Sequence, residues 1–521
     1  MAAQQALPPI STNTENAEDA KLFDWQLFVS YAGPGLLMCI AYLDPGNLEA
    51  DLQQGAYCGM ALLWVLLLSH VAGFFIQLLA ARLGNVTGKN LAQVCRDNMP
   101  WPMAMLVYMM TEIAIIGADI QEVLGTAVAW RILLGVDLWV GCIFTGFDAF
   151  MLLGAGHFGT RTLEGVVMVL LGAMTVCFWV NFLRDPPTGE EIGRGFVPTM
   201  PHYALRVAIG TIGAVIMPHN VYLHSAAVLS RNVDRRNAQQ VRTANKYCAI
   251  DAGMALFLCF LINMAVVGCY AQQFFAPTCA TASVTSACFS PSSERATFGT
   301  YGSCSVNGKS GVCTEIGLRS AGDGLQATLG STTKYLWAVG LLAAGLSSTM
   351  ITTYAGQFVM EGFLNLQVSQ RTRVVITRCV ALVPAVAVAL ASSKSTAFAD
   401  SVGQWLNVLQ SVQLPFALLP VLLLTDSQAI MGNFANSRLL SGICWTVAAI
   451  VFSVNGWLVG ELLWQADGLG TRAIVLWTLA SIVCIGYCST LVGVFRYLPS
   501  KAAQSAAFAI QNQGQTNYGT L

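Results

Sequence analysis

Charged residues are scarce in this chain. Only 10% of its 521 residues are Asp, Glu, Lys or Arg, whereas an average soluble domain has roughly 25%. Hydrophobic residues make up 55% of the chain, and the net charge is −1. This composition predicts an integral membrane protein, and it indicates neither a nucleic acid nor an obligate protein partner.

Several common signals are also missing. Residues 1–20 are polar and acidic, without the basic start and apolar core of a cleaved signal peptide, so we expect residues 1–28 to form a short tail. No Walker loop or other enzyme motif is present. We therefore expect no enzyme and no resident cofactor, and we expect any transport to be driven by an ion gradient.

Cysteines are present, and four of the 16 gather in one polar loop rich in Ser, Thr and Gly. That loop has no CxxC or Cys/His spacing typical of zinc sites. Four such cysteines predict two disulfides on an oxidising side of a membrane, and three pairings are open. The candidates are Cys279, Cys288, Cys304 and Cys313.

Long apolar runs recur along the whole chain. A spanning helix needs about 20 mainly apolar residues, and this measure predicts twelve spans. They cover residues 29–52, 59–81, 102–128, 133–154, 162–183, 206–229, 247–271, 335–352, 374–392, 402–424, 440–463 and 471–495.

The topology follows from the number of spans and from the loop charges. An even number of spans puts both termini on one side, and Lys and Arg are more numerous in the short loops of that side. The positive-inside rule then predicts that both tails, 1–28 and 496–521, are cytoplasmic. The cysteine-containing loop, 272–333, would lie outside, where disulfides can form.

Two segments with a shared pattern interrupt the first and sixth spans. Residues 41–47 read AYLDPGN, and residues 214–220, which begin 173 positions later, read AVIMPHN. Proline removes a backbone N–H and collides with the carbonyl four residues earlier. It also pushes the residue before it toward an extended conformation. Each segment is therefore predicted to unwind and to free an alanine carbonyl, that of Ala41 or Ala214.

A pair of broken helices has a functional meaning in a membrane. Unwound backbone is tolerated there only where it is buried or lines a cavity, and matching breaks in two halves indicate a transporter's substrate site. The second break comes five spans after the first, so residues 29–183 and 206–424 are predicted to be related by inversion. Residues 440–495 would add two further helices to this all-α core of 5+5 helices.

The donors at the breaks differ in chemistry. The first break offers the Asp44 carboxylate, the Asn47 amide oxygen and the Ala41 carbonyl, and the second offers the Ala214 carbonyl and the Met217 sulfur. Oxygen ligands suit Mg²⁺ and Ca²⁺ as readily as Mn²⁺, whereas a thioether favours softer transition metals. A single Met is usually a gap-filling core residue, but this one mirrors Asp44 directly before a proline.

These motifs resemble those of the NRAMP family. The strings DPGN at 44–47 and MPHN at 217–220 carry the resemblance, which extends through 345–349, 354–358 and 407–416. It implies a LeuT-like fold that moves divalent metals, Mn²⁺ and Fe²⁺ and also Co²⁺, Zn²⁺ or Cd²⁺, into the cytoplasm together with protons. Access to the site would alternate between the two faces of the membrane as helices 1 and 6 move.

The resemblance also implies one more metal ligand. Gln410 would supply a further oxygen, and Gln413, three residues later, is the competing assignment because both can face inward on one helix. NRAMP-related magnesium transporters lack the methionine, so Met217 argues against that branch.

Proton coupling needs titratable groups near the metal. Asp44 is the first candidate, because an arriving cation would displace its proton. His219 is adjacent to the second break, and the usual pKa of histidine is near neutral. A lone histidine in a membrane is more often a hydrogen-bonded packing residue, and we interpret His224 in that way.

Three acids lie within the third predicted span. Glu112, Asp119 and Glu122 are spaced so that they can share one face of a helix, and carboxylates in hydrocarbon are costly unless they are paired. Arg378 in the ninth span is the expected partner, and the family has an arginine there facing this helix. We interpret the set as a proton exit route; a structural ion-pair network is the alternative.

Two other functions remain as alternatives. A sodium-coupled amino-acid carrier would share the fold, but Asp44 would repel the substrate carboxylate. A non-transporting metal sensor would be expected to carry a large soluble domain, and this chain ends about 25 residues after the last span. The expected location is the plasma membrane or an endosomal, lysosomal or vacuolar membrane.

Overall fold

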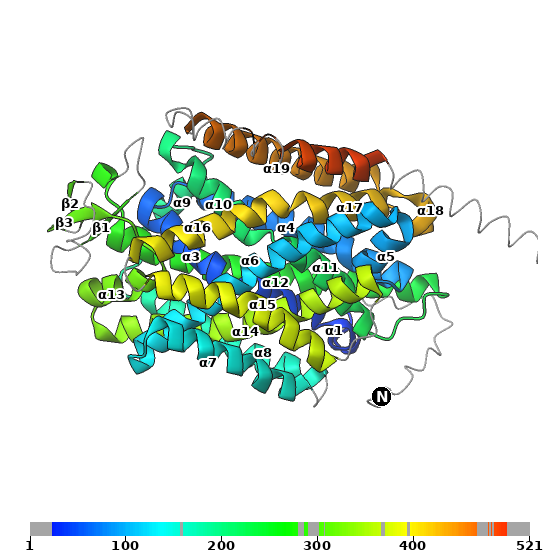
Figure 1. Cartoon of the computed structure of the whole chain (residues 1–521), viewed down its shortest axis with the longest axis horizontal. Helices are drawn as coiled ribbons and strands as arrows, with labels where there is room; N and C mark the ends of the chain where they lie inside the picture. Colours follow the sequence, from blue (N-terminus) through cyan, green and yellow to red (C-terminus); the bar gives the residue numbers. More distant parts are fainter. Residues whose placement is uncertain are drawn as a thin grey trace, which may run out of the picture.

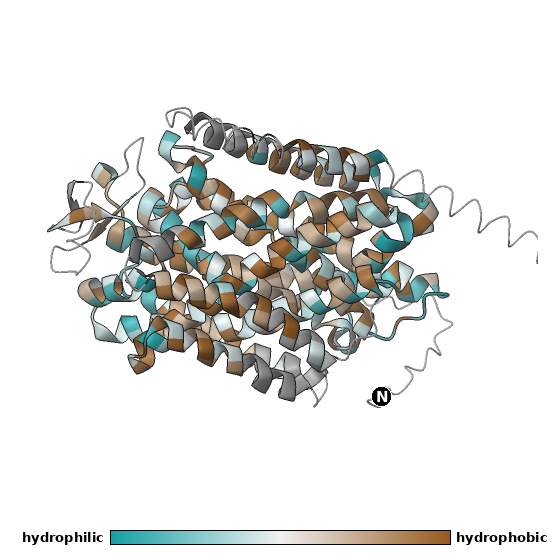
Figure 2. Ribbon diagram, in the orientation of Figure 1, coloured by the Kyte–Doolittle hydropathy of each residue, from teal (hydrophilic) through white to brown (hydrophobic). Residues whose placement is uncertain are grey.

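The computed structural model describes residues 23–156, 160–279, 286–289, 302–306, 308–365, 370–392, 396–465 and 484–496, with residues 478 and 481. Long helices run along the longest axis of the molecule, and a small sheet lies at one end (Figure 1). Hydrophobic residues dominate the middle of the helices, and hydrophilic residues gather toward their ends (Figure 2). This pattern is typical of a helical membrane protein.

The helices of the first half are α1 Trp25–Tyr31, α2 Pro34–Ala41, α3 Pro45–Cys58, α4 Leu63–Thr87, α5 Leu91–Asn98, α6 Trp101–Leu134, α7 Leu138–Gly156, α8 Thr160–Phe182 and α9 Gly189–Gly195. Those of the second half are α10 Leu205–Val215, α11 Pro218–Ala227, α12 Ala238–Phe274, α13 Leu318–Leu329, α14 Ser331–Leu364, α15 Gln370–Ser392, α16 Thr396–Gln413, α17 Pro415–Asp426, α18 Gln428–Met431 and α19 Arg438–Gln465. Short 3₁₀ turns occupy His202–Ala204, Val228–Ser230, Pro277–Cys279 and Gly432–Phe434.

Seven of the described helical segments are long and apolar enough to cross a membrane, and four shorter apolar stretches lie within the described parts of other helices. The first predicted span is in neither group, and its break divides it into α2 and α3. Several helices are longer than predicted: the eighth span was expected to end at residue 352, but α14 continues to Leu364. The reason is physical, since hydropathy marks only the part of a helix that lies in hydrocarbon.

Small residues bring helices into close contact, both between the two halves and within the second half. A Cβ atom at Gly84 on α4 would lie 2.4 Å from the backbone oxygen of Ser225 on α11. A Cβ atom at Gly213 on α10 would lie 2.3 Å from the backbone oxygen of Asn407 on α16. Close backbone approach at glycine is how membrane helices gain packing contacts.

Gly213→Ala should therefore destabilise the protein, because the added methyl group has no space between α10 and α16. Overpacking of this kind costs about 1–3 kcal/mol, so we expect a lower melting temperature in detergent. Gly210→Ala is the matched control on the same helix, since no heavy atom of another described element lies within 4 Å of its Cβ position. Equal melting temperatures for the two variants would contradict this packing.

The cysteine-containing loop forms a three-stranded antiparallel sheet in the order β1-β3-β2, for which the sequence predicted no regular structure. Its strands are β1 Ala287–Phe289, β2 Ser303–Val306 and β3 Lys309–Thr314. The structure pairs Cys279 with Cys313 and Cys288 with Cys304, one of the three possible arrangements.

This sheet is attached to the helical bundle near the C-terminal end of α3. The hydroxyl of Tyr57 accepts a hydrogen bond from the backbone N–H of Ile316 (2.9 Å) and donates one to the carbonyl of the same residue (3.1 Å). The Gln53 amide also donates to that carbonyl, at 3.3 Å. The residues that follow β3 are thus joined to α3 toward the end opposite the first break.

Candidate metal site at the two helix breaks

The first break has the geometry that its proline predicts. Helix α2 ends at Ala41, and α3 begins at Pro45. Asp44 is extended (φ −76°, ψ 168°), and its Oδ1 atom accepts hydrogen bonds from the backbone N–H of Asn47 (2.8 Å) and from its side-chain amide (2.7 Å). Asp44 is therefore the N-cap of α3, with proline at the first helical position.

The second break repeats this form with a different donor. Helix α10 ends at Val215, and α11 begins at Pro218. Met217 is extended (φ −84°, ψ 137°) and makes no capping hydrogen bond with its side chain. Its thioether is thus not engaged in holding the helix start, whereas the Asp44 carboxylate is.

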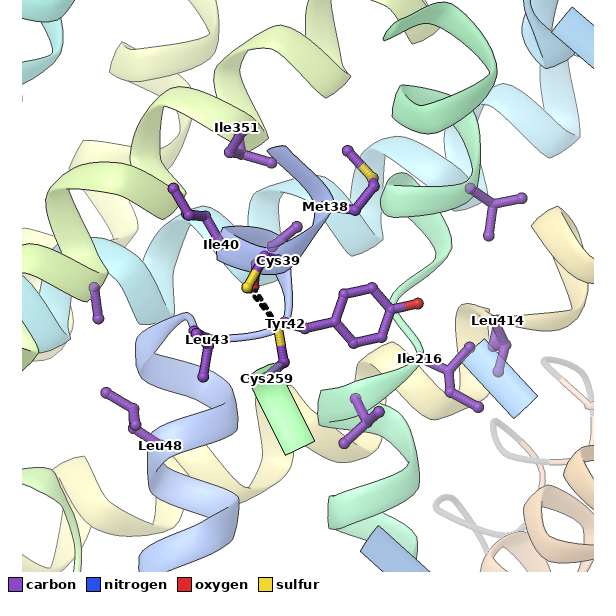
Figure 3. Packing of buried hydrophobic residues seen from close by; sticks show 14 of the residues in the cluster. Met38, Cys39, Ile40, Tyr42, Leu43, Leu48, Ile216, Cys259, Ile351 and Leu414 are labelled. Carbon is purple, nitrogen blue, oxygen red and sulfur yellow. Dashed lines mark hydrogen bonds between the residues drawn. The ribbon is translucent and has the colours of Figure 1, made fainter. Parts of the chain in front are cut away.

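The two breaks meet in the interior of the protein. The side-chain amide of Asn220, in the first turn of α11, donates to the carbonyl of Ala41 at 3.1 Å. Pro45 has no N–H to offer that carbonyl, so Asn220 supplies the missing donor from the other half of the chain. Figure 3 shows Tyr42 and Ile216, one from each unwound segment, in one buried cluster.

The break residues are withdrawn from solvent. Asp44 and Met217 are each 1% exposed, and Asn47 and Asn220 are fully buried. Within the described part of the chain, the Oδ1 atoms of Asn47 and Asn220 are buried without a hydrogen-bond partner. A buried oxygen with no donor costs free energy, so these two oxygens fit a cation as their partner. Ala214 is also fully buried, at the end of α10.

Sequence reasoning missed Asn220 as a site residue. A signal was available, because Asn220 follows Pro218 by two positions just as Asn47 follows Pro45. The repeat of asparagine in both motifs could have shown that each break carries its own amide.

Helix α16 brings further amides to the breaks. Gln410 donates from its amide nitrogen to the carbonyl of Ala114 at 2.7 Å. The Oε1 atoms of Gln410 and Gln413 are both buried without a partner among the described residues, so the choice between these two ligands stays open. Asn407, which sequence reasoning did not single out, donates to the carbonyl of Gly46 at 3.1 Å.

The three acids of the third span lie on α6, as their spacing predicts. Asp119 and Glu122 are buried, whereas Glu112 is half-buried. The Thr352 hydroxyl of α14 donates to a carboxylate oxygen of Glu122. Arg378 lies on α15, which packs against α6, but its side chain is outside the described part of the structure.

The two histidines of α11 differ in their surroundings. His219, next to Pro218, is 2% exposed, and its Nδ1 atom has no hydrogen-bond partner among the described residues. His224 makes a 2.9 Å hydrogen bond with Gln77, whose amide in turn donates to the Tyr42 hydroxyl at 3.2 Å. The bonding of His224 is that of a packing residue.

A small cavity near the first break has both polar and apolar residues in its lining. The cavity lies where α3, α10 and α16 meet, and Gln53, Arg206, Gln404 and Asn407 are among its lining residues. Asn407 lines this cavity and also contacts the first break directly, so the cavity adjoins the buried donors.

The chain is similar to known metal transporters over most of its length. The family described as natural resistance-associated macrophage protein-like matches residues 35–461. The metal transporter nramp1 homolog of Dictyostelium discoideum is 44% identical over 445 residues, 85% of this chain and 76% of that protein. Metal transporter Nramp2 of Arabidopsis thaliana is 41% identical over 492 residues, 93% of this chain and 86% of that protein.

Solved structures show the same fold. A manganese transporter of Eremococcus coleocola, crystallised with an aromatic bis-isothiourea compound, superposes with a TM-score of 0.75 at 26% identity, covering 96% of this chain and 99% of that one. Mhp1, a nucleobase-cation-symport-1 family transporter, has a TM-score of 0.51 at 14% identity over 92% and 93% of the two chains, a likeness of fold alone. The predicted LeuT-like arrangement is confirmed, and the match to residues 35–461 with relatives above 40% identity shows that this chain belongs to the Nramp family.

Proposed function

We propose that this protein carries divalent transition metals, with Mn²⁺ and Fe²⁺ as the main substrates, across a membrane together with protons. The observation that carries the proposal is the hydrogen bond from Asn220 to the Ala41 carbonyl. It joins the segment that carries the Asp44 carboxylate to the segment that carries the Met217 sulfur. The relatives named above are metal transporters, one of them a manganese transporter.

The substrate ion would be held by donors from both halves of the chain. The proposed ligands are Asp44, Asn47, Ala41, Ala214, Met217 and Gln410. The Ala41 carbonyl already accepts one hydrogen bond, but a carbonyl oxygen has two lone pairs and can serve the metal as well. Met217 would favour transition metals over the hard ions Ca²⁺ and Mg²⁺, and the amino-acid carrier is disfavoured because Asp44 stands where a substrate carboxylate would bind.

Protons would enter and leave through nearby titratable groups. Asp44 would release its proton when the metal arrives, His219 would act beside the second break, and Glu122 with Asp119 would lead the proton away along α6 toward Glu112. The hydrogen bond that the Thr352 hydroxyl donates to Glu122 supports this route because it holds the carboxylate in a fixed position. Arg378 would balance the charge from α15.

The direction of transport follows from the proposed orientation. Arginine and lysine lie mainly in the loops on the side of both termini, which supports cytoplasmic tails and metal movement into the cytoplasm. The disulfides between Cys279 and Cys313 and between Cys288 and Cys304 support an outer, oxidising location for the sheet. This orientation fits the plasma membrane and the endosomal, lysosomal or vacuolar membrane.

A transport assay in proteoliposomes tests the proposal. We expect added Mn²⁺ to enter vesicles that contain the protein, as read by a metal-sensitive dye, and to acidify the interior, as read by a pH dye. Empty vesicles are the control. Metal entry without acidification would contradict proton coupling, and the absence of both signals from a correctly folded protein would favour the metal sensor.

Glu122→Gln should reduce the number of protons that accompany each metal ion, because glutamine keeps the shape of the side chain but cannot carry a proton. Mn²⁺ binding should be unchanged, since Glu122 is not among the proposed ligands. Thr352→Val is the matched control, because it removes the hydrogen bond to Glu122 and leaves the carboxylate. An unchanged ratio of protons to metal in Glu122→Gln would mean that the acids of α6 are only structural.

A further inference from the structure

Helix α2, the inner half of the first broken helix, is held against α12 along its length. The carboxylate of Asp251 on α12 accepts hydrogen bonds from the backbone N–H groups of Gly33 (2.9 Å) and Gly35 (2.7 Å) at the start of α2. At the other end, the Asn263 amide donates to the carbonyl of Tyr42 at 3.3 Å. These bonds fix both ends of α2 to one helix.

Two buried thiols face each other between these end contacts. The Sγ atoms of Cys39 on α2 and Cys259 on α12 are 2.8 Å apart, and the Cys259 sulfur is 3.1 Å from the carbonyl oxygen of Cys39. Figure 3 shows the pair directly beside the unwound segment that begins after Ala41. Both side chains are fully buried. The pair therefore joins a half-helix of the proposed site to a helix of the surrounding bundle.

We propose that Cys39 and Cys259 are a redox-modification site, at which hydrogen peroxide forms a disulfide that fixes α2 to α12 and arrests transport. The inference rests on the proposed function, because only a transporter with alternating access needs α2 to leave α12. A disulfide has an S–S bond of about 2.05 Å. The sulfurs at 2.8 Å thus need to approach by less than 1 Å.

The chemistry balances in two steps. When α2 swings away to open the site, the Cys39 thiol meets water and peroxide; its sulfur attacks one peroxide oxygen, the O–O bond breaks, and a sulfenic acid and water form. When α2 returns, the Cys259 sulfur attacks the Cys39 sulfur, the S–O bond breaks, and a second water leaves. The two thiols together lose two electrons and two protons, and peroxide is reduced to two molecules of water.

A second thiol contact in the described part of the chain serves as a control. Cys484 and Cys488 hydrogen-bond to each other one turn apart in a single helix. Oxidation at that pair cannot join two helices. It can therefore reveal a general effect of peroxide, but not the arrest that a bond between α2 and α12 would cause.

The experiment uses the full chain in proteoliposomes during Mn²⁺ uptake. Peroxide is added, free thiols are blocked, and cross-linked peptides are identified by mass spectrometry without reduction. We expect a Cys39–Cys259 cross-link and loss of uptake in the parent protein and in Cys484→Ser, with recovery after dithiothreitol. Cys39→Ser and Cys259→Ser should keep their Mn²⁺ uptake after peroxide. If Cys39→Ser does not fold, Cys39→Ala takes its place. The loop disulfides are present in every variant, so reduction of the loop affects all of them equally.

Three results would overturn the proposal: no cross-link after peroxide during turnover, a cross-link without loss of uptake, or equal loss in the serine variants. Failure of the proposed function has a different signature, since untreated protein would then move no metal. In that case, hydrogen–deuterium exchange of the α2 amides tests whether oxidation fixes α2 to α12. If oxidation slows exchange over Pro34–Ala41 in the parent protein but not in Cys39→Ser, a disulfide between α2 and α12 is supported. Unchanged exchange in the parent protein contradicts it.

Discussion

Asp44→Ala should abolish Mn²⁺ binding and uptake. Asp44 is the single acid within the two break segments, 41–47 and 214–220, so its loss removes the only negative charge that these segments offer the ion. Changes to groups that merely orient a metal ligand cost 10–100-fold in affinity, so loss of a ligand should weaken binding by more than about 100-fold. Isothermal titration calorimetry with Mn²⁺ measures the affinity directly.

The matched control for this prediction is Asp44→Asn. Asp44 also caps α3 through hydrogen bonds with Asn47, and loss of an N-cap costs about 1 kcal/mol of stability. Asparagine is an equally good N-cap but carries no charge, so it separates the two roles. We expect Asp44→Asn to melt near the temperature of the parent protein and still to fail in Mn²⁺ binding. Tight binding by this variant would place the metal elsewhere.

Met217→Ala should leave Mn²⁺ transport in place and weaken the discrimination against Ca²⁺ and Mg²⁺. The remaining proposed ligands are oxygens, which bind hard and borderline ions alike. We expect Ca²⁺ to compete with Mn²⁺ uptake at about tenfold lower concentration than in the parent protein, a change of about 1.4 kcal/mol. Competition of unlabelled Ca²⁺ and Mg²⁺ against Mn²⁺ uptake gives this ratio.

Met38→Ala provides the comparison for this variant. Met38 is also fully buried, on α2 near the first break (Figure 3), and truncation of a buried methionine costs about 2–5 kcal/mol at either position. Effects of lost packing should therefore be similar in the two variants, whereas the change in ion selectivity should appear only at Met217. Unchanged selectivity in Met217→Ala would remove sulfur from the set of ligands.

The sequence was sufficient to predict where the helices break. Proline acts on its immediate neighbours, so the extended conformations of Asp44 and Met217 could be expected from three or four residues of sequence. The hydrogen-bond partners of the backbone carbonyls at the breaks could not be predicted in this way. Asn220 is 179 residues from Ala41, and Asn407 is 361 residues from Gly46, so these bonds depend on how the two halves pack against each other.

The pairing of the loop cysteines also could not be predicted from the sequence, because it depends on contacts between distant residues. Spacing alone left three arrangements for Cys279, Cys288, Cys304 and Cys313. The pairing that the structure has depends on strand register: Cys304 stands opposite Gly311 on β3, and the Cys288 sulfur lies 2.8 Å from where a Cβ atom of that glycine would be. Such short strands carry too few side chains for the sequence to specify one register.

The attachment of the three-stranded sheet to α3 has a consequence for how this loop can evolve. Tyr57 and Gln53 hold the loop at Ile316 through its backbone N–H and carbonyl, which every amino acid except proline can offer. Substitution at position 316 by any residue except proline leaves these three bonds chemically possible. The Ile316 side chain is fully buried in the hydrophobic core, so an exchange for another apolar residue would keep both the packing and the attachment to α3.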